Sequence, residues 1–162
     1  MESLTGHLLI VSADEPDPDF AKTAILMIQH SRQQAVGVVL NRPSGQTVEE
    51  LWKSEVKKPC DRRGPVYSGG PVPGPLMALH TCGELSEIEV LEGVHYSVRK
   101  QNLQKLVRRT DGRLKVFDSH AGWGPGQLEE QLRLGTWLST PTSVDQVFDE
   151  GPDLWEKFAR QV

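Results

Sequence analysis

The sequence predicts a single α+β domain that spans residues 1–162 and is built on a mixed β-sheet with flanking helices. Two observations support this fold class. Apolar, strand-like runs occur in pairs separated by short polar turns, which is typical of hairpins. Helical patterns stand between some of these runs, but strands and helices do not alternate regularly, so a doubly wound parallel sheet is not favoured.

The composition indicates an ordinary globular protein. Of 162 residues, 37% are hydrophobic and 25% are charged, which is enough apolar material for a core without disulfide or metal staples. The net charge of −4 argues against non-specific binding to nucleic acid or to a membrane surface. The two cysteines follow no C-x-x-C pattern, and no hydrophobic leader or membrane-spanning run is present. We therefore expect a cytoplasmic protein with reduced thiols.

The first third of the chain predicts strands and one short helix. Residues 8–11, 22–30 and 35–40 are apolar runs, and the last two should form a hairpin. Residues 12–20 are rich in acidic residues and proline and predict a loop, whose acidic side chains lack the calcium-loop pattern. Residues 41–45 should form a turn. Thr47 and Glu50 then form a capping box for a helix that ends near Lys53.

The middle of the chain predicts a loop, further strands and a proline-rich break. Residues 55–65 are polar and predict a loop, and residues 66–68 and 76–80 predict strands. Residues 71–75 should lie outside the sheet, because their three prolines have no amide hydrogen to donate. Residues 88–91 and 94–98 flank a Glu-Gly turn and predict a second hairpin.

The last third begins with an amphipathic helix over residues 99–109, whose apolar face carries Leu103, Leu106 and Val107. This helix is the one predicted crossover. A strand over residues 113–117 follows, and the glycine-rich stretch 121–129 should turn the chain into a helix over residues 126–134. A capping box at Ser143 predicts another short helix, and a final helix should begin at Pro152.

Several residue clusters invite a catalytic interpretation. His30 and His80 each end an apolar strand, where either could act as a general base, and Cys82 lies two residues from His80 and could be activated as a thiolate. The alternative is that the histidines only make hydrogen bonds at strand ends and that the thiol is buried and inert. Asp118, Ser119 and His120 are consecutive, so they cannot form a proton relay among themselves. The histidine spacing fits no zinc motif, and the sequence points to no metal and no cofactor.

Two further features could bind anions. Three alternate glycines, at positions 122, 124 and 126, precede a helix, but Pro125 removes an amide and two glutamates follow in the helix. A basic patch could meet nucleic acid, although such charges are more often the solvated face of a helix. The residues of this basic patch are Lys105, Arg108, Arg109, Arg113 and Lys115.

The chain resembles the AlgH/YqgE family of bacterial proteins over residues 6–158. The resemblance is carried by ordered blocks along the chain. They are Gly6-x-Leu8-Leu9-Ile10, Asp17-Pro18-x-Phe20-x-Lys22-Thr23, Ile28-x-His30, Gly37-x-Val39-x-Asn41-Arg42-Pro43, Gly69-Gly70-Pro71-Val72, Leu79-His80, Ala121-Gly122-Trp123-x-x-Gly126-Gln127-Leu128-Glu129 and Trp137-Leu138. The chain departs from the family pattern at Ala13, at Ser119-His120 and at Gln131. The resemblance implies coiled, bifurcated β-sheets, and the family name implies a role in transcriptional regulation.

Three functional hypotheses follow. The first is a small-molecule or peptide binding module with a regulatory role, because polar residues and glycines gather at predicted strand ends. Its predicted site comprises Asn41, Arg42, Gly69, Gly70, Pro71, His80, Trp123 and Gln127. The second is a transcriptional regulator that binds DNA through the basic patch, which the acidic composition argues against. The third is an enzyme that uses His30, His80 or Cys82. The partner would be an unidentified small molecule or protein.

Overall fold

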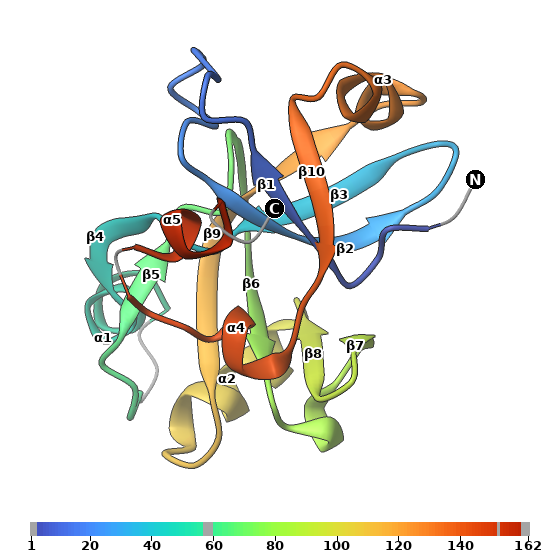
Figure 1. Cartoon of the computed structure of the whole chain (residues 1–162). Coiled ribbons are helices and arrows are strands. Elements are labelled where there is room, and N and C mark those ends of the chain that lie inside the picture. Colours follow the sequence, from blue (N-terminus) through green and yellow to red (C-terminus); the bar gives the residue numbers. More distant parts are fainter. Residues whose placement is uncertain (1–2, 57–59, 152, 160–162) are drawn as a thin grey trace.

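The computed structural model describes residues 3–56, 60–151 and 153–159 and confirms the α+β class (Figure 1). The ten strands are β1 (His7–Val11), β2 (Ala24–His30), β3 (Ala35–Val39), β4 (Pro43–Thr47), β5 (Pro65–Tyr67), β6 (Val72–His80), β7 (Ile88–Leu91), β8 (Val94–Ser97), β9 (Leu114–Trp123) and β10 (Trp137–Pro141). The α-helices are α1 (Val48–Leu51), α2 (Lys100–Arg108), α3 (Gln127–Arg133), α4 (Val144–Val147) and α5 (Leu154–Ala159). A π-helical turn, Trp52–Val56, follows α1, and a 3-10 turn, Gly83–Leu85, follows β6.

Strand β9 divides the sheet into two branches. The order along the main path is β10-β1-β2-β3-β9-β6-β8-β7, and β5 joins β4 to β9 beside this path. The end of β9 pairs with β3, while its first half pairs with β6 on one side and, in parallel, with β5 on the other. Figure 1 shows β9 as the long central strand that reaches both branches. The predicted mixed, bifurcated sheet is thereby confirmed.

Both predicted hairpins form, as β2–β3 and as β7–β8. Helix α2 is the predicted crossover, because it leads from β8 to β9 and both of these strands pair antiparallel with β6. The predicted apolar face of α2 is buried in a second, smaller core together with Trp52 and Val116. The capping box at Thr47 is also confirmed, since its hydroxyl accepts a hydrogen bond from the Glu50 amide at 3.1 Å.

Three predicted boundaries are wrong. Residues 43–45 of the predicted 41–45 turn belong to β4, because this strand pairs with β5. Residues 72–75 belong to β6: Pro73 lies opposite Ser119 of β9, and β8 pairs only farther along, at residues 78–80. A proline is tolerated where one edge of its strand is unpaired and the register shifts, as it does between Pro73 and Met77. Finally, residues 121–123 extend β9, because β3 supplies them with a partner.

Two predictions fall at the limits of the described chain. Of the predicted 55–65 loop, residues 55–56 continue the π-helical turn and residues 57–59 lie outside the described residues. Pro152, the predicted start of the last helix, also lies outside them. The C-terminal segment from α4 to α5 crosses the sheet and ends beside β1 (Figure 1). It buries Leu154, Trp155 and Phe158 in the main core.

Candidate functional site

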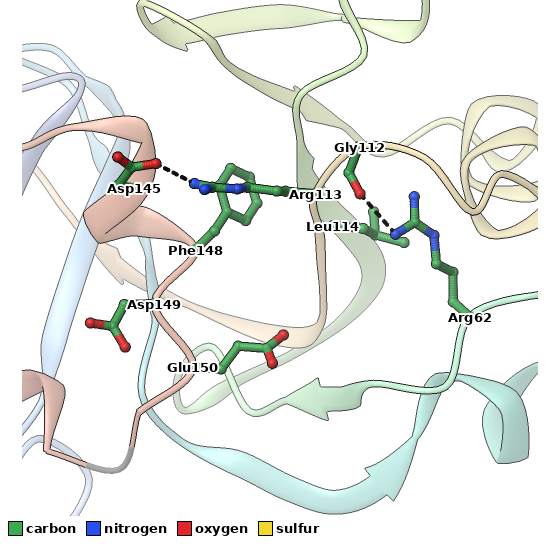
Figure 2. A pocket seen from close by; sticks show the side chains of 8 residues that line it. All are labelled: Arg62, Gly112, Arg113, Leu114, Asp145, Phe148, Asp149 and Glu150. Atoms are coloured by element: carbon green, nitrogen blue, oxygen red, sulfur yellow. Dashed lines mark hydrogen bonds and ion pairs between the residues drawn. The ribbon is translucent and has the colours of Figure 1, made fainter.

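A charged groove lies between the start of β9 and the C-terminal segment. Its main hollow has a volume of about 440 Å³ and is shown in Figure 2. The lining residues are Arg62, Gly112, Arg113, Leu114, Asp145, Phe148, Asp149 and Glu150. An adjoining hollow of about 430 Å³ shares Arg62, Leu114 and Glu150 with the first, so we treat the two as one feature, the β9 groove. Each volume falls within the usual range for small-molecule sites.

One wall of the β9 groove is fixed by an ion pair. The guanidinium of Arg113 contacts Asp145 Oδ1 at 2.6 Å. Asp145 is placed there because Ser143 caps helix α4, its hydroxyl accepting from the Gln146 amide. Phe148 follows the same helix and gives the groove an apolar surface next to this pair (Figure 2).

The opposite wall is formed by Arg62. Its guanidinium donates to the carbonyl oxygens of Gly112 at 3.1 Å and Asp111 at 2.7 Å. Its Nε is buried and has no hydrogen-bond partner among the described residues. Burial lowers the pKa of Arg62, with the charge of Asp111 opposing the effect. Because a guanidinium stays protonated at physiological pH, this wall carries a positive charge that only backbone carbonyls contact.

The third side of the groove is acidic. Asp149 accepts hydrogen bonds from the Gly151 amide at 2.7 Å and from Lys157 at 3.1 Å, and these two contacts, the first above all, lower its pKa. Glu150 is exposed, and its side chain makes no ion pair or hydrogen bond within the described ranges. Figure 2 shows its carboxylate extending from the C-terminal segment toward the side of the groove on which Arg62 lies.

Behind the acidic side lies a buried lysine. Lys115 is 1% exposed, and its ammonium donates to Leu40 O at 3.1 Å and Asp149 O at 2.9 Å. It also lies 4.7 Å from the centre of the Tyr67 ring. Burial lowers the pKa of Lys115 to about 8, and burial followed by the nearby acidic charges raises the pKa of Tyr67 to about 12. Lys115 thus joins the C-terminal segment to the sheet.

The structure brings four of the predicted site residues together. Asn41 accepts from the Ala24 amide at 3.1 Å and donates to Lys22 O at 2.9 Å. Arg42 donates to the carbonyl oxygens of Pro18, Asp19 and Ala21, so both side chains hold the 12–22 segment in place.

Gly69 and Gly70 lie beside Asn41 and Arg42, because Val39 and Ser68 bridge the two segments through backbone hydrogen bonds. A Cβ on Gly69 would lie 2.1 Å from Ser119 O, so the glycines allow this segment to approach β9 closely. Pro71 follows and is exposed.

His80 lies at the opposite end of the β6–β9 ladder from these glycines, since it pairs with Leu114 whereas Val72 pairs with His120. Its Nδ1 accepts from the Cys82 amide at 3.1 Å, so Nε2 carries the proton and donates to Ser97 Oγ at 2.8 Å. Burial, with the charge of His95, lowers the pKa of His80 to about 4. The Cys82 thiol instead contacts the Arg109 guanidinium at 3.2 Å.

Trp123 and Gln127 lie at the far end of β9. The indole N–H groups of Trp123 and Trp137 both donate to Gln131 Oε1, at 2.9 and 2.8 Å, which gives a structural role to a position where the chain departs from the family pattern. Gln127 accepts from the Gly124 amide at 2.7 Å.

His30 lies near this end as well. It accepts at Nδ1 from the Leu4 amide, and its Nε2 contacts Glu129 Oε1 at 2.7 Å. None of the eight predicted binding residues lines the hollows described above. Their role in ligand binding stays a prediction.

The predicted basic patch is divided by the fold. Lys115 is buried, and Arg113 pairs with Asp145 in the β9 groove. Arg108 pairs with Asp61 at 3.2 Å and Arg109 with Asp111 at 3.3 Å. Of the five cations, Lys105 alone is exposed without an acidic partner among the residues the structure describes. The patch therefore offers little uncompensated charge to a phosphate backbone.

The sequence interpretation missed Arg62 and Glu150. The only signal was the short acidic run of Asp149 and Glu150 before Gly151, and nothing in the sequence connects this run to residue 62. Among the described residues no cluster of histidine, cysteine and acidic residues could hold a metal ion. None of the described helices has both the length and the hydropathy that a membrane crossing requires.

Comparison with known proteins identifies similar chains. A family profile described as AlgH-like matches residues 8–162. A UPF0301 protein of Myxococcus xanthus is 34% identical over 99% of this chain and 91% of its own length, and one of Chlorobaculum tepidum is 32% identical over 96% and 84%. The solution structure of AlgH from Pseudomonas aeruginosa has a TM-score of 0.81 at 30% identity, covering 98% of this chain and 88% of that one. A crystal structure from Corynebacterium diphtheriae, at 22% identity and a TM-score of 0.79, shows the same fold over 100% of this chain and 88% of its own.

Proposed function

The protein belongs to the AlgH-like family, and we propose that it is a binding module with a regulatory role whose ligand is a small charged molecule or a short peptide. The observation that supports this most is the β9 groove itself. Two adjoining hollows of about 440 and 430 Å³ share Arg62, Leu114 and Glu150, so one ligand could contact all three. Pockets of this size with a few convergent polar groups are the usual places for ligands.

The groove walls favour binding by preorganised charges. Arg62 is held by two backbone carbonyls, and Arg113 is held by Asp145. Side chains that are already fixed lose little conformational freedom when a ligand arrives, which favours affinity. A regulatory role would follow if ligand binding changed how the C-terminal segment rests on the sheet, since Asp149 and Glu150 belong to that segment.

A thermal-shift screen tests the proposal. The purified protein is screened against nucleotides, acidic metabolites, amines and short peptides. A ligand at one hundred times its Kd adds about 2.7 kcal/mol to stability. For a domain of this size that corresponds to a shift of roughly several degrees in Tm.

Variants of groove residues test whether a ligand-induced shift in Tm arises from binding in the β9 groove. Glu150→Gln and Arg62→Gln should abolish it, while Glu92→Gln and Arg32→Gln, which change exposed residues elsewhere, should retain it. The proposal fails if no compound shifts the Tm, or if every shift persists in both groove variants.

A further inference from the structure

We propose that the ligand of the β9 groove is dipolar: it carries an ammonium group that meets Glu150 and an anionic group that meets Arg62, as free amino acids and short peptides do. This inference rests on the binding function proposed above and narrows its ligand class. It depends on which charges of the groove are already compensated within the protein.

Most charged side chains around the groove have a partner of opposite sign. Arg113 pairs with Asp145, Asp149 with Lys157, Asp61 with Arg108 and Arg63 with Glu49. Two charges remain among the described lining residues. Glu150 makes no ion pair within the described ranges, although its charge acts on buried Lys115, and the guanidinium of Arg62 makes hydrogen bonds only to backbone carbonyls. These same two residues line both hollows, so the two charges without an ion pair are shared by the hollows.

The remaining positive charge suits an anion. Carbonyl oxygens orient the Arg62 guanidinium, and Asp111, whose charge acts on it, is already paired with Arg109. A guanidinium has five N–H donors; in Arg62 two are used and the one on Nε is buried, which leaves two for a ligand. A carboxylate is a preferred partner for the planar fork of an arginine.

The remaining negative charge suits a cation. The Glu150 carboxylate is exposed and extends into the groove (Figure 2). An ammonium group placed against it would gain a hydrogen-bonded ion pair in a partly enclosed site.

Ligands with charge of only one sign fit less well. A simple anion drawn to Arg62 would also meet Glu150, and a simple cation drawn to Glu150 would also meet Arg62. Repulsion from the charge of like sign would offset part of the attraction to the charge of opposite sign. A dipolar ligand gains both attractions, and Leu114 and Phe148 supply apolar contact for the atoms between its charges.

Isothermal titration calorimetry with a matched set of probes tests the inference. The probes are the dipeptide Ala-Leu, its N-acetyl form, its C-terminal amide, and free leucine. The free dipeptide or leucine should bind, and each capped form should bind at least about tenfold more weakly. Binding by leucine as well would favour a free amino acid as the ligand, and binding by the dipeptide alone would favour a peptide.

Variants then assign each charge to its residue. In Glu150→Gln the penalty of N-acetylation should disappear, and in Arg62→Gln the penalty of amidation should disappear, whereas Glu92→Gln should keep both penalties. Because Glu150 is exposed, its variants should fold even if Arg62→Gln does not. Glu150→Lys should then bind the N-acetyl form more tightly than the free dipeptide.

Two results would overturn the inference: capped and free probes that bind equally, or penalties that persist in the groove variants. Failure of the dipolar probes alongside a hit from the wider screen that is lost in Glu150→Gln would refute the ligand class and leave the binding function standing. Failure of every compound would refute both.

Discussion

The ammonium group of Lys115 sits in an environment that disfavours its charge and yet binds it from several sides. Its contacts are Leu40 O, Asp149 O and the face of the Tyr67 ring. Asp149 and Glu150 add negative charge nearby, which supports the protonated form, but burial outweighs them and lowers the pKa to about 8. Near neutral pH the residue is therefore a buried cation, and its protonation changes at mildly alkaline pH.

Lys115 should make the free energy of unfolding increase as pH rises. In the folded protein its pKa is about 8, whereas an unfolded lysine has an ordinary value of 10.5. Between these values the unfolded chain binds more protons, so the free energy of unfolding increases as pH rises through this window. The full effect is about 3 kcal/mol, because one pKa unit corresponds to about 1.4 kcal/mol. Above pH 10 the raised pKa of Tyr67, about 12, acts in the opposite direction.

Urea unfolding at pH 7.5, 8.5 and 9.5 measures this contribution. Lys115→Met keeps a similar apolar stem but has no group that titrates, so its free energy of unfolding should not show this increase. The wild type should therefore become more stable relative to the variant as pH increases. Parallel pH profiles for the two proteins would show that Lys115 has an ordinary pKa.

At the scale of single residues, the sequence could predict what a local pattern shows. The buried face of α2 follows from its helical period, and the caps at Thr47 and Ser143 follow from residue type and spacing. Lys115 could not be assigned in this way. Its sequence context places it in a basic patch, but β9 is covered by α2 on one face and by the C-terminal segment on the other. A charged side chain in this strand is therefore enclosed.

Among the structural elements, the contact between β9 and residues 69–70 requires glycine. At Gly69 an added Cβ would lie 2.1 Å from Ser119 O, and at Gly70 it would lie 2.2 Å from the carbonyl carbon of His120. Both clashes are with backbone, which cannot rotate away as a side chain can. A larger residue at either position could therefore be accommodated only if residues 69–70 or β9 moved.

Gly69→Ala should destabilise the protein by about 2–3 kcal/mol, in the range of overpacked cores. Gly64→Ala is the matched control, because an added Cβ there meets nothing within 4 Å. Its effect should be within about 1 kcal/mol and could be stabilising through the unfolded chain. Thermal and urea unfolding of both variants measure the difference. Equal stability of the two variants would mean that the crossing is looser than the structure shows.

The arrangement of elements shows why the strands were predicted better than their ends. Hairpins join neighbouring segments, so the sequence contains both partners and the turn between them. The beginning of β6 and the end of β9 depend instead on partners far along the chain, since Pro73 pairs with Ser119 and Ala121 with Gly37. The β9 groove is equally hard to predict from the sequence, because Arg62, Arg113 and Glu150 come from three separate segments.

For the whole molecule, the C-terminal segment is part of the core as well as one side of the groove. The Trp155 indole donates to Val11 O at 3.1 Å, which ties α5 to β1. Phe158 is 3% exposed within the main core. Lys115, on β9 of the sheet, donates a hydrogen bond to Asp149 O and so binds this segment to the sheet. The C-terminal segment lines the β9 groove with Asp145, Phe148, Asp149 and Glu150, which lie at or just before these anchors.

Phe158→Ala should therefore lower the free energy of unfolding by about 3–5 kcal/mol, the usual cost of deleting a buried aromatic ring. Leu134→Ala removes an apolar side chain that is 64% exposed, and it should change stability by about 0.5 kcal/mol or less. Urea unfolding followed by tryptophan fluorescence compares the two, and a single shared transition is expected because α5 packs in the same core as β1 and β10. A small effect of Phe158→Ala, or a separate early transition in that variant, would show that the C-terminal segment docks onto a core that is stable without it. The β9 groove would then exist only while this segment is docked. In that case ligand affinity should decrease when docking is lost, although the rest of the sheet stays folded.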